Sequence, residues 1–145
     1  MQKVKVLVSA GSKHGATAEI ADAIGRRLEA AGHEVTVLKP SDVTHVERFD
    51  AFVLGSGVYA GHWLAQAKDL VHEVGRHAQD RPVWLFSSGP LGSPAEPDRE
   101  AVDVSSLVQA VHARGHELFC GKLDKSLLGF AERAIVAAVR APEGD

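Results

Sequence analysis

Short runs of apolar residues alternate with stretches of helical spacing along the whole chain. Most of these runs are continuously apolar, which is typical of parallel strands covered on both faces. They predict strands at Lys3–Ser9, Glu34–Leu38, Ala51–Ser56, Val83–Ser88 and Glu117–Lys122. Apolar positions three and four residues apart predict helices at Thr17–Ala31, His62–His77, Val104–Ala113 and Ser126–Arg140.

This order of elements predicts an α/β fold: a doubly wound, five-stranded parallel sheet with strand order 2-1-3-4-5, in a three-layer αβα sandwich. Ligands of such sheets bind outside the carboxyl ends of the strands, where the strand order reverses. The loops after the first, third and fourth strands are therefore the candidate site. The short crossover Pro40–Asp50 has room for only a turn or two of helix. Gly32 is placed to end the first helix, and Asp103 to cap the third.

Composition restricts the class of protein. A chain of 145 residues with 45% hydrophobic and 24% charged residues fits a single globular domain over residues 1–145. The net charge of −3 is too small to indicate a nucleic-acid partner. The single cysteine, Cys120, excludes an internal disulfide and favours a reducing, cytoplasmic location. We expect neither a signal peptide nor a transmembrane segment.

The loop after the first strand carries the main chemical signal. The apolar run ends in the small and hydroxyl residues Ser9 to Thr17, and helical spacing begins at once. A strand that turns this tightly into a helix directs unpaired backbone N–H groups, with the helix dipole behind them, at one spot. That arrangement favours a phosphate. Neither a Walker loop nor the dinucleotide fingerprint is present, because three residues separate Gly11 from Gly15 and no Gly-x-Gly-x-x-Gly occurs.

The loops after the third and fourth strands are also rich in small residues. Residues 55–63 read Gly-Ser-Gly-Val-Tyr-Ala-Gly-His-Trp, in which glycines allow backbone to approach a flat ligand. Tyr59 is equally compatible with a ligand contact and with burial, whereas Trp63 is expected in the core. Residues 87–92, Ser-Ser-Gly-Pro-Leu-Gly, offer N–H and hydroxyl donors to the polar edge of such a ligand.

The first loop, Gly-Ser-Lys-His-Gly-Ala-Thr, resembles the phosphate loop of the flavodoxins, with His14 where flavodoxins usually have a hydroxyl. The stretches 12–21, 50–56 and 61–62 resemble the subgroup that contains menaquinone-dependent protoporphyrinogen dehydrogenase. The resemblance implies a flavodoxin-like strand order and an FMN cofactor, with its phosphate on Ser12 to Thr17. Its ring would lie between residues 56–61 and 87–92. The implied cofactor residues are Ser9, Gly11, Ser12, Lys13, His14, Gly15, Ala16, Thr17, Ser56, Gly57, Val58, Tyr59, Ala60, Gly61, Ser87, Ser88, Gly89, Pro90, Leu91 and Gly92.

Three functional hypotheses follow from the resemblance. The chain is an electron carrier between protein partners, a quinone- or porphyrinogen-linked dehydrogenase, or a flavin-free regulatory module of the same fold. The missing insertion between Ser88 and Lys122 argues against the porphyrinogen chemistry, and His14 keeps the flavin-free module open. A homodimer is compatible with all three. Lys13, His14 and His62 around the site predict a less acidic flavin environment than that of low-potential carriers, although Glu96 and Asp98 lie further along the chain.

No catalytic side chain and no metal site is predicted. His72 and His77 are five positions apart on a helix, which places the two imidazoles on nearly opposite faces. Ser56 lacks the Gly-x-Ser-x-Gly pattern of a nucleophile elbow, and Cys120 lacks a Cys-x-x-Cys partner. The redox chemistry would therefore belong to the cofactor.

Overall fold

The computed structural model describes residues 4–13, 15–89, 103–119, 129–130 and 133, and all statements below concern these residues. Five parallel strands form the sheet in the order β2-β1-β3-β5-β6, which confirms the predicted topology. The strands are β1 Lys5–Gly11, β2 Glu34–Leu38, β3 Ala51–Tyr59, β5 Val83–Ser88 and β6 Gly115–Phe119. A further short strand, β4 His62–Trp63, pairs with β3 in the antiparallel direction.

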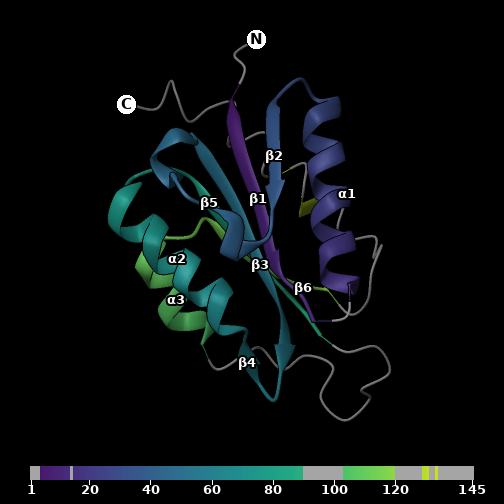
Figure 1. Cartoon of the computed structure of the whole chain (residues 1–145), viewed down its shortest axis with the longest axis vertical. Coiled ribbons are helices and arrows are strands. Elements are labelled where there is room, and N and C mark those ends of the chain that lie inside the picture. The colour runs from purple at the N-terminus through teal and green to yellow at the C-terminus, as the bar shows by residue number, and fades with distance from the viewer. Residues whose placement is uncertain (1–3, 14, 90–102, 120–128, 131–132, 134–145) are drawn as a thin grey trace.

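Helices cover both faces of the sheet. Figure 1 shows α1, Ala16–Ala30, on one face and α2, Ala65–His77, with α3, Val104–Val111, on the other. The predicted fourth helix lies outside the described residues except at 129–130 and 133, which are helical. The crossover between β2 and β3 holds two single 3₁₀ turns, Pro40–Asp42 and Val46–Arg48, as its length predicted. Within the described part of the chain, no helix combines the length and the apolarity that a membrane span requires.

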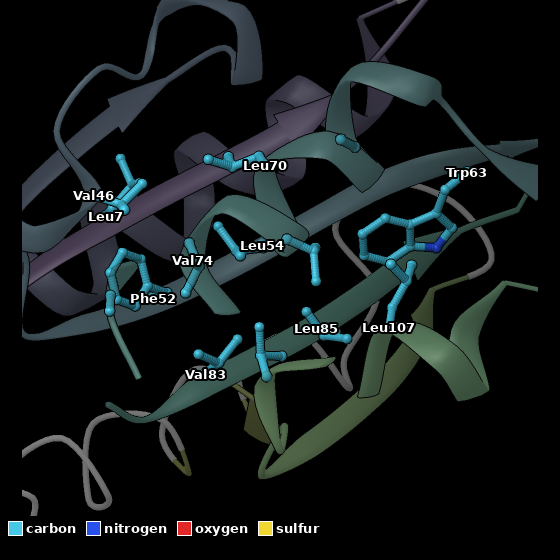
Figure 2. Close-up of a cluster of buried hydrophobic side chains, with 14 of the residues drawn as sticks. Leu7, Val46, Phe52, Leu54, Trp63, Leu70, Val74, Val83, Leu85 and Leu107 are labelled. Carbon is cyan, nitrogen blue, oxygen red and sulfur yellow. The ribbon is translucent and has the colours of Figure 1, made fainter. Parts of the chain in front are cut away.

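Two apolar layers hold the sandwich together. Successive residues of a strand point to opposite faces, so Val6 and Val8 face α1 while Leu7 faces α2. On the α1 side, Phe86, Phe119 and Phe130 pack with ring centroids 5.8–6.2 Å apart. Figure 2 shows the layer under α2 and α3, whose buried members include Leu7, Phe52, Leu54, Trp63, Leu70, Val74, Leu85 and Leu107. Each such side chain contributes about 1.5–3 kcal/mol on burial.

The C-terminal end of α1 is set by glycine, as expected. Gly32 has φ +97°, a left-handed conformation that costs glycine little. Its N–H donates to Glu29 O at 2.9 Å, and the N–H of His33 donates to Leu28 O at 3.3 Å. These two bonds form a Schellman motif, which satisfies the last carbonyl groups of the helix.

The main correction to the predicted elements lies after the third strand. The helix predicted from His62 begins only at Ala65, and β3 continues to Tyr59 instead of ending at Ser56. Ala60 at φ +53° and Gly61 at φ +81° form a two-residue turn, so the chain folds back as a hairpin. The expected helical pattern failed here because the two residues of β4 are too few to show a strand period.

The other boundaries differ by less. The first strand runs from Lys5 to Gly11 and so reaches two residues further than Ser9. The last strand starts at Gly115 rather than Glu117, and the part of its predicted range after Phe119 lies outside the described residues. Such shifts at element ends are common, because strands pair slightly beyond their apolar run.

Candidate functional site

The strand ends from which the three candidate loops start lie at one edge of the sheet. In the parallel register, Gly11 of β1 pairs with Ser56 of β3, and Ser56 in turn pairs with Ser87 of β5. The carboxyl ends of these strands therefore lie side by side, as the predicted strand order requires. Figure 1 shows the β3–β4 hairpin projecting at the same edge at which α1 begins.

The first loop, residues 11–17, exposes backbone donors. Gly15 is the N-cap residue of α1 at φ +94° and, being glycine, supplies no side-chain cap to this helix. The Ser12 hydroxyl accepts the N–H of Gly15 at 3.0 Å, which closes the loop on itself. A Cβ built on Gly15 would meet no atom of the described residues within 4 Å, apart from the chain neighbours of Gly15 and the backbone of its own helix, so the side-chain position at this residue is open. A helix N-terminus has unpaired first-turn N–H groups and the positive end of the helix dipole, which suit an anion.

Tyr59 connects the first loop with the hairpin. Its hydroxyl accepts the backbone N–H of Lys13 at 3.1 Å, and the Lys13 ammonium lies 4.8 Å from the centroid of its ring. The ring crosses above Gly57, where a Cβ would lie 2.6 Å from the tyrosine hydroxyl. Tyr59 is partly buried rather than in the core, and it makes a loop-to-loop contact that the sequence did not predict; its contact with a ligand stays a prediction.

Trp63 anchors the far strand of the hairpin in the core. Its side chain is 2% exposed, which confirms the core assignment, and Figure 2 shows it in the α2–α3 layer. The indole N–H donates to Ser87 Oγ at 2.9 Å, and that hydroxyl lies 2.8 Å from Nε2 of His116. The Ser56 hydroxyl accepts the N–H of Leu64 at 3.0 Å and donates to the carbonyl of Gly57 at 2.7 Å. Two buried serines thus hold the base of the hairpin.

Asp103 was predicted to cap α3, and its side chain does not do so. The residue stands at the N-cap position, but the structure shows no side-chain capping bond there. Its carboxylate instead accepts the N–H of Trp63 at 3.0 Å, with His62 Nδ1 at 3.4 Å and Lys68 Nζ at 3.6 Å. Burial alone would raise the pKa of this carboxyl, but the hydrogen bond from Trp63, the contact with His62 and the charge of Lys68 together outweigh burial and lower the pKa. Sequence reasoning missed this contact because it joins residues 40 positions apart.

The remaining predicted residues are placed as follows. Ser9 lies inside β1, 1% exposed, and strand alternation puts its side chain on the face that α2 covers, like that of Leu7. The Ser9 hydroxyl has no hydrogen-bond partner in the described structure. Thr17 is buried in the first turn of α1. Ser88 is buried at the end of β5, and Gly89 follows it with its N–H on the carbonyl of Phe119. His14, Pro90, Leu91 and Gly92 lie outside the described residues.

Comparisons with known proteins agree with this fold. A flavodoxin from the domain Archaea matches with a TM-score of 0.72 and 20% identity over 95% of this chain and 99% of that one. A flavodoxin of Streptococcus pneumoniae TIGR4 matches with a TM-score of 0.73 and 18% identity over 92% and 98%. The flavodiiron protein of Giardia intestinalis has a TM-score of 0.69 and 20% identity over 96% of this chain and 36% of that one. At these identities the matches establish the fold.

A search of curated protein sequences finds no match. The family model of the flavodoxin domain, however, matches residues 7–145, which include all three loops described above. The chain therefore belongs to the flavodoxin domain family and, with it, to the FMN-binding electron-transfer proteins.

Proposed function

We propose that FMN binds at the carboxyl ends of β1, β3 and β5 and that the chain carries electrons between redox partners. The phosphate would bind to residues 12–17, and the ring would lie between residues 56–61 and the loop that begins at Ser87. The observation that carries this proposal is that α1 begins at Gly15, a glycine N-cap without a side-chain cap and with an open side-chain position, next to the ends of β1 and β3. A phosphate there would accept first-turn N–H groups of the helix.

The hairpin supports the second half of this proposal. Bound FMN supplies the one- and two-electron redox chemistry, and the protein contributes position and electrostatics. The side chains of Ser56 and Ser87 are engaged in holding the hairpin, so the backbone of residues 57–61 is what remains to face the ring. Tyr59 holds the rim of this loop against Lys13, which keeps the two halves of the site at a fixed separation.

The first experiment is a titration of the apoprotein with FMN, followed by quenching of flavin fluorescence. We expect one FMN per chain, and a substantial loss of affinity in Gly15→Val, because a β-branched residue is strained at φ +94°. Gly32→Val is the matched control, since Gly32 has φ +97° at the opposite end of the same helix. Equal affinities in the Gly15 and Gly32 variants would contradict the phosphate site.

A second experiment separates the carrier from the dehydrogenase that the sequence resemblance implied. The whole-chain likeness to two flavodoxins supports the carrier. A carrier needs a reductase, and its flavin stays oxidised when a porphyrinogen or a quinol is the only addition. Anaerobic bleaching of the flavin by either compound alone would establish the dehydrogenase instead.

Sedimentation of the holoprotein in the same buffer decides between a monomer and the homodimer.

The charges around the loops bear on the redox potential. Lys13 is an exposed cation on the first loop, and His62, which is charged only when protonated, is exposed on the hairpin. Nearby cations favour the anion that reduced flavin forms. We therefore propose that the reduced state is more accessible here than in low-potential carriers, and an equilibrium redox titration measures it. A second couple as negative as in those carriers would contradict this proposal.

A further inference from the structure

We infer that Asp103 is a positioning residue for the flavin site, because it holds the β3–β4 hairpin in place from the start of α3. This inference rests on the proposed function, in which the hairpin faces the ring. Asp103 lies outside all three loops that were expected to contact the cofactor, and it acts only through the hairpin.

The contacts of Asp103 join three elements. Its carboxylate accepts the N–H of Trp63 in β4, faces Lys68 in the first turn of α2, and belongs to the residue that precedes α3. His62 of the hairpin approaches the other carboxylate oxygen at 3.4 Å. The side chain is only 16% exposed, so these contacts are partly shielded from water and from salt.

The local structure shows that this arrangement is not the default one for an aspartate. At an N-cap position, aspartate normally accepts a backbone N–H of its own helix. Here the Asp103 side chain forms no such bond and reaches across to the hairpin. Residues that break a local rule in favour of a distant contact are concentrated at functional sites.

The hairpin needs such a support. β4 has two residues, pairs with β3 as its one partner among the described strands, and stands off the main sheet order. An isolated two-stranded hairpin is marginally stable. Two further bonds, from Leu64 N–H to Ser56 and from the indole N–H of Trp63 to Ser87, hold its base. Asp103 adds the bond to the main chain of β4, which fixes the height of residues 58–62 over the edge of the sheet.

The test compares three variants of the full chain. Asp103→Ala removes the acceptor, Asp103→Asn keeps a carbonyl oxygen for Trp63 N–H, and Asp69→Asn removes a charge from an exposed carboxylate beside Lys68. We expect the Kd for oxidised FMN to rise about tenfold in Asp103→Ala, and to stay within about threefold of the original in the other two. An unchanged Kd in Asp103→Ala would overturn the inference, and so would an equal loss in Asp103→Asn.

The redox potential of the bound flavin separates positioning from general stability. This potential depends on the ratio of the affinities for oxidised and reduced FMN, and a uniform loss of stability weakens both alike. We expect Asp103→Ala to shift the potential and Asp69→Asn to leave it unchanged. A lower melting temperature with an unshifted potential would mean that Asp103 is merely structural.

Two further outcomes keep the test decisive. If Asp103→Ala does not fold, amide hydrogen exchange of Trp63 in the unmodified apoprotein replaces it, and exchange as fast as in an exposed amide would overturn the inference. If the unmodified chain and Asp69→Asn both fail to bind FMN, the proposed function itself fails. If both bind and Asp103→Ala binds equally well, only the role of Asp103 is lost.

Discussion

The first loop and the β3–β4 hairpin lie at the same edge of the sheet but are built in different ways. The first loop is closed by a contact across three positions, from Ser12 to Gly15, and its one contact with the hairpin that the structure describes is made by Lys13 with Tyr59. The hairpin is held by side chains that come from 8 to 40 positions away. A phosphate is recognised largely by backbone donors at a helix N-terminus, whereas a flat ring needs surfaces held at a fixed height.

Because of this difference, we expect substitutions in the two regions to have different effects. A substitution in the first loop should weaken cofactor binding and leave the fold nearly intact. A substitution under the hairpin should cost folding stability first and cofactor affinity as a consequence. The four predictions below test that division.

Trp63→Ala should have the largest effect. The side chain is 2% exposed in the α2–α3 layer, and removal of a buried tryptophan typically costs about 3–5 kcal/mol of unfolding free energy. Urea unfolding of the apoprotein measures it. Trp63→Phe is the control, because it keeps an aromatic ring and loses only the donor to Ser87. A loss in the alanine variant no greater than in the phenylalanine variant would show that the bond, and not the packing, supports the hairpin.

Thr17→Ala should act on binding instead. Thr17 lies in the first turn of α1, and the lost hydroxyl contact to a phosphate corresponds to about 1–3 kcal/mol of FMN affinity. Fluorescence titration with FMN, set beside titration with riboflavin, measures the contribution of the phosphate. The variant should lose affinity for FMN and keep its affinity for riboflavin. Equal losses of affinity for FMN and for riboflavin would mean that Thr17 supports the fold and does not contact the phosphate.

Ala60→Gly should stabilise the hairpin slightly. Ala60 occupies a left-handed conformation at φ +53°, which costs a non-glycine residue about 1–2 kcal/mol. Glycine removes this cost, although its greater freedom in the unfolded chain offsets part of the gain. Thermal unfolding should show a small rise in Tm. A fall in Tm would mean that the methyl group of Ala60 contributes contacts that outweigh the backbone strain.

The pH dependence of stability should show the smallest effect and should distinguish the two regions. The pKa of Asp103 is lowered in the folded chain, so the unfolded chain binds its proton first as the pH falls. The stabilisation is therefore complete above the ordinary aspartate pKa and is lost below about pH 4, through the lowered folded value. Unfolding free energies between pH 6 and pH 3 should decline less steeply in Asp103→Asn. If the unfolding free energies of the original chain and of Asp103→Asn fell equally with pH, the hairpin would not be stabilised by an ionised Asp103.

The two regions also differ in how far the sequence predicts them. The order of the sheet, Gly32 at the end of α1 and the strand-to-helix turn at Gly15 were all predictable, because each depends on neighbouring residues. The hairpin was not predicted: β4 is two residues long, and its hydrogen bonds come from Asp103 and Ser87. Aspartate before a helix indicates a cap from the local sequence, and only the folded chain shows that its carboxylate accepts the N–H of Trp63 instead.

The hydroxyl of Tyr59 should couple binding at the first loop to binding at the hairpin. Since it accepts the amide of Lys13, an ion that immobilises the first loop also restricts the tyrosine, and a ring seated on the hairpin restricts Lys13 in return. Inorganic phosphate and riboflavin, offered as separate molecules, would then favour each other's binding by one common factor, as reciprocal linkage demands. In Tyr59→Phe we expect this cooperativity to vanish, so that phosphate and riboflavin bind independently of each other.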